Sequence, residues 1–232
     1  MLKQLAQKRK KLMSYAAYIF DLDGTLLDTM DDFVAITNAT LTKLGYRTYT
    51  RPVMESFFGK GGLEALFREA MSKSDTSEVS TDENLAKRAT QIWSEVFCEQ
   101  GFEHTTVYPQ VKETLSMLKA QGAKLAVLSN KKDKHAKSTI EHFFPNIFDA
   151  IHGEAPGFPR KPDPQGLMHT MEELGVKPQE TAYVGDSAGD INVARAAKTL
   201  AVAVDYGYGT NGNISDANAD VIISHFSQLL EL

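Results

Sequence analysis

A short apolar stretch that ends in two closely spaced acids is the feature that most constrains this chain. Residues 15–20 read Tyr-Ala-Ala-Tyr-Ile-Phe and are typical of a buried β-strand. Asp21 and Asp23 follow at once, and Gly24 and Thr25 suit a tight turn. In an open α/β sheet, ligands bind beyond the carboxyl ends of the strands. The stretch therefore predicts two carboxylates at a binding edge, although a strand-ending turn whose acids face water fits the same residues.

Four more short apolar stretches follow later in the chain, and helical-looking stretches separate them. Alternating strands and helices are typical of a parallel sheet with helices on both faces. We therefore expect an α/β fold with a doubly wound parallel sheet. The predicted strands cover residues 124–128, 181–184, 201–204 and 220–223, and helices are expected over 110–120 and 190–197.

The segment 29–105 differs from the rest of the chain. Helix-like segments, such as 33–44 and 85–99, make up much of it, and no part is typical of a sustained buried strand. We predict a helical cap domain inserted between the first strand and the rest of the sheet. The α/β core is then expected to comprise residues 1–28 and 106–232.

Composition narrows the classes of function. A chain of 232 residues with 42% hydrophobic residues can bury a large core, and its net charge of −5 argues against nucleic acid as a partner. No apolar run approaches the roughly 20 residues that span a bilayer. The basic segment 1–13 lacks the apolar region of a secretory signal, so no membrane contact is expected. Cys98 is the only cysteine, which excludes an intrachain disulfide and agrees with a cytoplasmic location.

Two further groups of polar residues are candidates for binding phosphate. Ser129 and Asn130 follow the apolar run 124–128, and a hydroxyl with backbone N–H groups at a helix start can contact a phosphate. Capping of the next helix would explain the same two residues. Lys161 lies in the stiff segment 160–164 and could neutralise a phosphoryl oxygen. An exposed loop lysine is the simpler alternative.

A second pair of acids, Asp186 and Asp190, follows the strand predicted over 181–184. Residues four apart share one face if a helix begins here. Clustered carboxylates suit a hard divalent cation such as Mg²⁺. Asp190 could instead be a first-turn acid that the helix dipole favours.

The four groups occur in the order acid pair, hydroxyl, lysine, acid pair. Together they supply a nucleophile, a proton carrier, phosphate ligands and metal ligands, which is a complete set for phosphoryl transfer. In these motifs and their order, residues 15–232 resemble the haloacid dehalogenase-like superfamily of phosphohydrolases, with its Rossmann-like core. The inserted segment resembles the helical cap of one subgroup, and the stretches 128–131 and 160–164 look most like its phosphoglycolate phosphatase branch.

The resemblance implies a role for each motif residue. Asp21 would attack phosphorus and form an aspartyl phosphate, and Asp23 would protonate the leaving alcohol and then activate water. The magnesium ion would be held by Asp21, the backbone carbonyl of Asp23 and Asp186, with Asp190 beside them. Phosphate would be bound by Ser129 and Lys161, with the N–H of Asn130 as a helper.

Substrate choice is expected to depend on the cap. Lys60 and Gly61 lie in a glycine-containing stretch that could enter the active site, where Lys60 would meet a second anion; a solvent-exposed turn is the alternative. The expected partner is a small phosphorylated metabolite, bound by a monomer or a homodimer. Alternatives are a sugar phosphomutase, a pyrophosphatase or nucleotidase of the same superfamily, or a non-catalytic binding protein on this fold. The histidines, including His152 and His169, show no metal-ligand pattern in the sequence.

Overall fold

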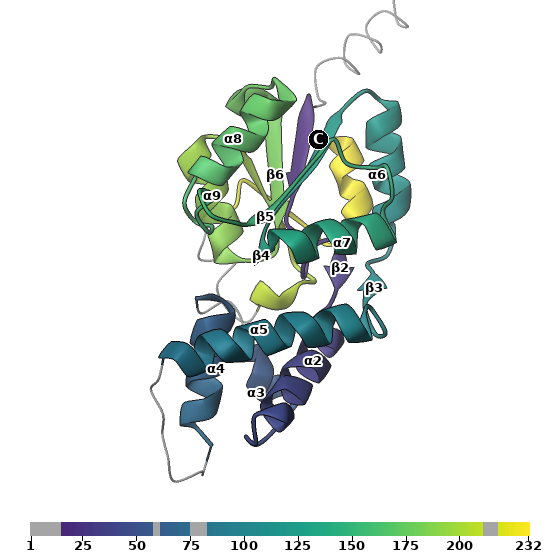
Figure 1. Cartoon of the computed structure of the whole chain (residues 1–232). Helices are drawn as coiled ribbons and strands as arrows, with labels where there is room; N and C mark the ends of the chain where they lie inside the picture. Colours follow the sequence, from purple (N-terminus) through teal and green to yellow (C-terminus); the bar gives the residue numbers. More distant parts are fainter. Residues whose placement is uncertain (1–14, 58–60, 75–82, 211–217) are drawn as a thin grey trace, which may run out of the picture. The chain divides into compact units, whose positions relative to one another are not determined.

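A parallel sheet organises the larger part of the molecule. The computed structural model describes residues 15–57, 61–74, 83–210 and 218–232. In these residues the strand order is β5-β4-β1-β6-β7-β8 (Figure 1). The predicted doubly wound parallel sheet is therefore confirmed. Its strands are β1 (Ala17–Phe20), β4 (Lys124–Lys132), β5 (Ala150–Glu154), β6 (Thr181–Gly185), β7 (Leu200–Val204) and β8 (Val221–Ile223).

The central strand β1 lies where the strand order changes direction. Phe20 pairs in register with Val127 of β4 on one side and with Val184 of β6 on the other. The chain adds β4 and β5 on one side of β1, and then β6, β7 and β8 on the opposite side. Such a switch point opens a crevice beyond the carboxyl ends of the adjacent strands. The residues that follow β1 and β6 are therefore placed to share a ligand.

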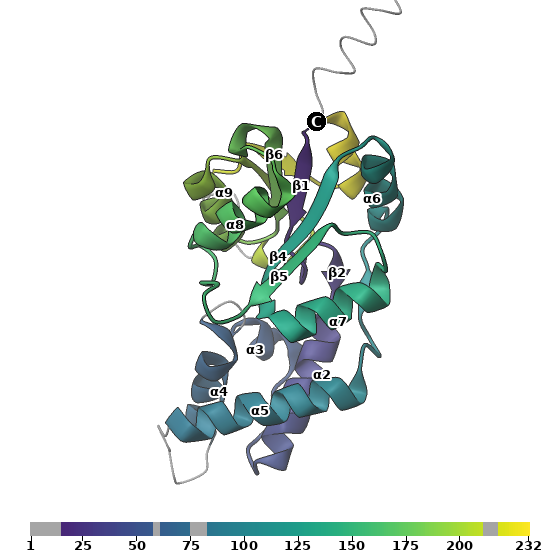
Figure 2. The same ribbon diagram turned by 45° about the horizontal axis from the view of Figure 1, so that its top comes forward.

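Alternating side chains of the buried strands form two hydrophobic cores, one on each face. Tyr18 and Phe20 pack on one face, and Ile19 packs on the other. Each core is closed by helices, as Figures 1 and 2 show. The first face is covered by α6 (Val111–Ala120), α7 (Asp133–Phe143) and the short η3 (Phe226–Glu231), and the second by α8 (Gln165–Leu174) and α9 (Ala188–Ala197).

The edge strand β5 is the one strand of this sheet that the sequence pattern does not predict. It reads Ala-Ile-His-Gly-Glu and pairs only with β4. An edge strand is half-covered and tolerates polar residues and glycine, so its apolar signal is weak. Ile151, His152 and Glu154 are accordingly only partly buried.

Residues 29–106 form a second compact unit, whereas residues 1–28 and 107–232 form the first. Within the second unit, α2 and α4 both pack against the long helix α5. Phe67, Met54 and Trp93 are among the buried residues of its core. The helices are α2 (Met30–Lys43), α3 (Arg51–Glu55), α4 (Gly62–Ser72) and α5 (Glu83–Gln100).

Two very short strands lie where the chain enters and leaves the helical unit. β2 (Leu27–Asp28) and β3 (Thr106–Val107) form a separate two-stranded sheet. The remaining short elements are η1 (Pro178–Glu180) and η2 (Tyr208–Thr210). None of the helices in the described ranges combines the length and apolar character needed to cross a bilayer.

Asp32 connects the first helix of the helical unit with the last residues of this unit. Its carboxylate accepts hydrogen bonds from the backbone N–H groups of His104 and Thr105, at 2.9 and 2.8 Å, and from the Thr105 hydroxyl at 2.5 Å. Asp32 is buried although it lies in the first turn of α2. The start of the unit is thereby bonded to its end. The neighbouring Asp31 is exposed and pairs with Arg51 at 2.6 Å.

We expect Asp32→Ala to destabilise the helical unit by about 2–4 kcal/mol, because it leaves buried hydrogen-bond donors without their acceptor. The matched variant Asp31→Ala loses only an exposed ion pair and should change stability by less than about 1 kcal/mol. Trp93 is the only tryptophan and lies in this unit, so urea unfolding followed by its fluorescence measures both effects. Equal midpoints for the two variants would contradict the role of Asp32.

Candidate active site

Two carboxylates meet at the switch point of the sheet. Asp21 directly follows β1, and its backbone N–H donates to the carbonyl of Val184 in β6 at 2.9 Å. Asp186 directly follows β6 and is 3% exposed, whereas Asp21 is 9% exposed. Parallel pairing of the two strands thus carries both acids to one edge.

Lys161 places a buried positive charge between two acids. Its Nζ lies 2.8 Å from Asp21 Oδ1 and 2.6 Å from Asp190 Oδ1, and the Lys161 side chain is 4% exposed. Nζ also donates to the hydroxyl of Tyr183 at 3.0 Å. Burial alone would lower the pKa of Lys161, but the carboxylates of Asp190 and Asp21 raise it well above its ordinary value. The lysine therefore stays charged, in spite of its burial.

Asn130 fixes the main chain that carries this lysine. Its side-chain Oδ1 accepts from the Lys161 N–H at 2.8 Å, and its Nδ2 donates to the Lys161 carbonyl at 3.2 Å. The amide therefore clamps both polar groups of one residue. Ser129, on the same strand β4, is buried, and its hydroxyl accepts from the Lys131 N–H at 3.3 Å. Phosphate binding by Ser129, by the Asn130 N–H and by Lys161 stays a prediction.

Asp186 lies in a cradle of donors from two loops. Oδ1 accepts from the Thr25 hydroxyl at 3.2 Å, and Oδ2 accepts from the backbone N–H groups of Tyr208 and Gly209, at 2.7 and 3.2 Å. Glycines beside this cradle leave room for the Asp186 carboxylate. A Cβ at Gly24 would lie 2.4 Å from Asp186 Oδ2, and one at Gly207 would lie 2.3 Å from the Asp186 Cβ.

Both carboxylate oxygens of Asp190 are held by polar contacts. Its Oδ2 accepts from the N–H and hydroxyl of Ser187, at 3.0 and 2.5 Å, which completes a capping box at the start of α9. Its Oδ1 contacts Lys161 and the hydroxyl of Tyr183. The contacts of Asp190 therefore agree both with a first-turn acid of the following helix and with a residue of the site. Direct metal ligation by this residue stays a prediction.

The crowding of buried acids perturbs their protonation. Burial, with the nearby carboxylates adding to it and Lys161 opposing it, raises the pKa of Asp21 to about 6. Burial and the charges of Asp190 and Asp21 raise the pKa of Asp186 to about 7. One ammonium does not balance these carboxylates, so a bound cation would favour their ionised forms.

The arrangement fits a divalent metal ion. Carboxylate oxygens of Asp21, Asp186 and Asp190 lie within 4.8 Å of one another. Asp21 Oδ1 is buried and in ionic contact with Lys161, but no donor in the described part of the chain meets it with hydrogen-bond geometry. An all-oxygen set with a spare acceptor is what a hard cation prefers. The side chains of this cluster could therefore hold such an ion; the carbonyl of Asp23 stays a predicted further ligand.

Asp23 carries a partner that the sequence did not indicate. The Nζ of Lys131 lies 3.0 and 3.3 Å from the two carboxylate oxygens of Asp23, and both side chains are largely buried. Lys131 comes from β4, so the ion pair connects the turn after β1 with the neighbouring strand. The lysine orients the acid to which the resemblance assigns proton transfer. The sequence pattern indicated only the two residues that precede it, Ser129 and Asn130, as members of the site.

The loop after β7 is a second part of the site that was not among the predicted site residues. Residues 206–209 read Tyr-Gly-Tyr-Gly, which suggests an ordinary glycine-rich loop, but two of their N–H groups bind Asp186. The hydroxyl of Tyr206 donates to the Thr25 carbonyl at 3.0 Å. The closely spaced glycines were the available signal, since a Cβ at Gly209 would lie 2.1 Å from the Asp186 carbonyl oxygen.

The two predicted specificity residues come from the stretch that the sequence assigns to the cap. Lys60 lies outside the described residues. Gly61 lies in the helical unit as the N-cap of α4, with a left-handed φ of 111° that favours glycine. Their contact with substrate stays a prediction.

Known proteins resemble the chain over nearly its whole length. A family model described as haloacid dehalogenase-like hydrolase matches residues 18–204. A phosphoglycolate phosphatase from Vibrio parahaemolyticus is 33% identical over 92% of this chain and 93% of its own length. One from Chromobacterium violaceum is 34% identical, over 93% of this chain and 95% of its own. The crystal structure of a predicted phosphoglycolate phosphatase from Haemophilus somnus has a TM-score of 0.86 at 28% identity, covering 95% of this chain and 98% of that one.

We expect Gly24→Ala to weaken divalent-metal binding at the acid cluster, probed with Mg²⁺, at least about tenfold, because the new methyl group displaces the Asp186 carboxylate. Gly122→Ala is the matched control. Gly122 has a similar positive φ of 92°, against 87° for Gly24, but open space around its Cβ position. Titration calorimetry measures the affinity in both variants, and circular dichroism confirms that both are folded. Unchanged affinity in Gly24→Ala would exclude Asp186 from the metal site.

Proposed function

The chain belongs to the haloacid dehalogenase-like hydrolases and is a phosphatase, and we propose that it hydrolyses 2-phosphoglycolate with Mg²⁺ as cofactor. The contact that carries the proposal is the 2.8 Å approach of the Lys161 ammonium to Asp21 Oδ1. A carboxylate held beside a fixed positive charge can approach an anionic phosphate ester, which would otherwise repel it. The phosphoglycolate phosphatases similar to this chain over most of its length support the choice of substrate.

In the first step, an Asp21 oxygen attacks phosphorus. A bond forms between that oxygen and phosphorus while the bond from phosphorus to the leaving alcohol oxygen breaks. Asp23, in its protonated form, gives its proton to the departing oxygen. The products of this step are the free alcohol and an aspartyl phosphate on Asp21.

In the second step, water attacks the phosphorus of the aspartyl phosphate. Asp23 is now a carboxylate and takes the proton of the attacking water. The bond between phosphorus and the Asp21 oxygen breaks, phosphate leaves, and Asp21 returns to its ionised form. The Lys131 ion pair, at 3.0 Å, holds the Asp23 carboxylate in place between the two proton transfers. Lys161 and Ser129 hold the phosphoryl oxygens.

Asp21, the Asp23 carbonyl and Asp186 would hold the Mg²⁺ ion, with Asp190 beside them. The ion, when bound, supplies positive charge that stabilises the phosphoryl oxygens in the transition state. The oxygen-only donor set favours Mg²⁺ over softer ions. Asp190 acts mainly through Lys161, whose ammonium it contacts at 2.6 Å.

We propose further that the enzyme acts in the cytoplasm on a small free metabolite, as a monomer or a homodimer. Its single cysteine agrees with a reducing compartment. The net charge of −5 agrees with a partner other than nucleic acid.

We expect Asp21→Asn to lower kcat for phosphate release at least about a thousandfold, because the amide cannot act as a nucleophile. The control is Asp31→Asn, which changes an exposed acid of the helical unit and should leave kcat unchanged. Phosphate release is measured with Mg²⁺ across 2-phosphoglycolate, sugar phosphates, nucleotides and pyrophosphate. Near-native activity of Asp21→Asn would exclude the covalent step, and a strong preference for another compound would exclude 2-phosphoglycolate as the substrate.

A second test concerns recognition of the carboxylate of 2-phosphoglycolate. If Lys60 binds this group, Lys60→Ala should raise KM for 2-phosphoglycolate about tenfold, but leave KM for a neutral phosphate ester nearly unchanged. Lys43→Ala removes an exposed lysine of the same helical unit and serves as the control. Equal changes in KM for the charged and the neutral substrate would exclude this role for Lys60.

A further inference from the structure

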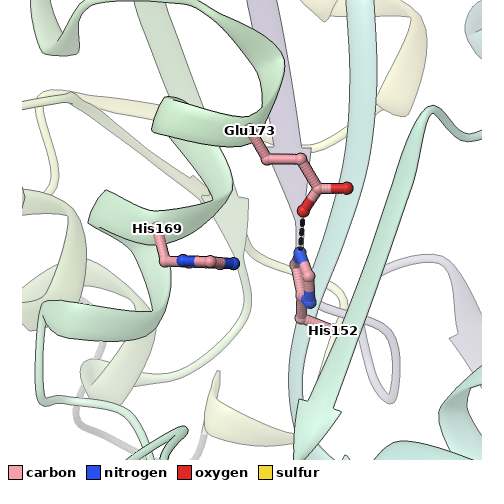
Figure 3. A group of neighbouring side chains, drawn as sticks. All are labelled: His152, His169 and Glu173. Carbon is pink, nitrogen blue, oxygen red and sulfur yellow. Dashed lines mark hydrogen bonds and ion pairs between the residues drawn. The ribbon is translucent and has the colours of Figure 1, made fainter.

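His152, His169 and Glu173 form a cluster of potential metal ligands outside the acid cluster of the active site. His152 comes from the edge strand β5, and His169 and Glu173 come from α8. The two helical residues are four apart and therefore lie on one face of the helix. Figure 3 shows the ring of His169 pointing toward that of His152, with Glu173 reaching the same place from the next turn. Two imidazoles and one carboxylate thus converge between one strand and one helix.

The distances suit a shared ion after small side-chain movements. His152 Nε2 lies 2.8 Å from Glu173 Oε2. One ligand atom from each of the three residues lies within 4.8 Å of the other two. Tetrahedral coordination with bonds of about 2.0–2.1 Å separates ligand atoms by roughly 3.4 Å. The 2.8 Å contact is shorter than this value and the upper limit of 4.8 Å is longer, so the three side chains need only small adjustments to share an ion.

Phe158 holds both imidazole rings in place. The His152 ring stacks on Phe158 with centroids 4.8 Å apart and planes inclined by 20°. The His169 ring meets Phe158 edge-on, at 5.0 Å and 87°. Phe158 itself packs against the hydrophobic core on the α8 face of the sheet. A ligand set held by packing loses less conformational freedom when an ion binds.

The chemistry of the cluster differs from that of the active site. Two imidazoles and one carboxylate suit Zn²⁺ and similar transition ions, whereas Mg²⁺ prefers oxygen ligands alone. The cluster is also accessible, since the Glu173 side chain is 46% exposed and that of His152 is 17% exposed. An ion can therefore enter from solvent, with water as its remaining ligand.

We propose that His152, His169 and Glu173 form a second metal site, which binds Zn²⁺ or a similar transition ion and links β5 to α8. The site is independent of the proposed phosphatase activity. A plain ion pair between His152 and Glu173 would not require His169. The role of His169 therefore separates a metal site from an ion pair.

The test is a titration of the full chain with Zn²⁺ in the presence of excess Mg²⁺, which competes with Zn²⁺ for the oxygen ligands of the acid cluster. Calorimetry compares the unmodified protein with His169→Ala and with His142→Ala. His142 is an exposed histidine on α7 and is the matched control. We expect His169→Ala to weaken Zn²⁺ binding at least about tenfold, and His142→Ala to leave it unchanged. Equal Zn²⁺ affinity in the unmodified protein and in His169→Ala would overturn the proposal.

A spectroscopic measurement identifies the ligands directly. Cu²⁺ bound in place of Zn²⁺ gives an electron paramagnetic resonance spectrum in which coordinating imidazole nitrogens split the lines. The proposal requires that two nitrogens split the lines in the unmodified protein and that only one does so in His169→Ala. His152→Gln should likewise remove one nitrogen. A spectrum that neither substitution changes would overturn the proposal.

Discussion

The buried ammonium of Lys161 is the contact on which the active site depends. It lies between Asp21, which follows β1, and Asp190, in the first turn of α9, and it contacts both at ion-pair distance. Removing one member of such a buried pair leaves an uncompensated charge in a poorly hydrated place. This explains why so many other groups fix the lysine, from the Asn130 clamp on its backbone to the hydroxyl of Tyr183. However, this one ammonium does not balance the negative charge of the cluster. Asp186 adds a further carboxylate, whose described hydrogen bonds include no cationic partner. A divalent cation would complete the balance.

The fold brings these groups together by a simple geometric rule. In a parallel sheet all strands present the same end to one edge, so the residues that follow β1 and β6 meet those in the last part of β4 although they are far apart in the sequence. The change of strand order at β1 leaves room for a ligand between β1 and β6. Lys161 enters the same region from the segment that precedes α8, and Asn130 on β4 bonds its backbone. Each chemical group is therefore fixed by a different element of the sheet or its helices.

Much of this could be predicted from the sequence, because buried strands and the acids that follow them leave strong local signals. The strands predicted at 15–20 and 181–184 correspond to β1 and β6, and the helices predicted at 110–120 and 190–197 correspond to α6 and α9. The acids Asp21 and Asp186 were indicated by the same short patterns. The features that were missed depend on contacts between distant residues. Strand β5 has the polar sequence of an edge strand and was not predicted. The contact of His152 on this strand with His169 on α8 could therefore not be predicted either. Lys131 has no local signal of function, since its role arises only from contact with Asp23. The closely spaced glycines of the loop at 206–209 are a local signal, but they do not by themselves identify the contact with Asp186.

The short pair of strands β2 and β3 determines how easily the helical unit could be exchanged. Because the two strands are hydrogen-bonded neighbours, the chain leaves the α/β core and returns to it at points about one strand spacing, roughly 4.8 Å, apart. Any insertion whose two ends lie at that spacing can be joined to the core. The entropic cost of closing such an insertion rises only slowly with its length. Asp21, Lys161, Asp186 and Asp190 all lie outside the insertion. The segment 29–106 is thus replaceable as a module, and its sequence can diversify while the chemical groups of the core remain in place.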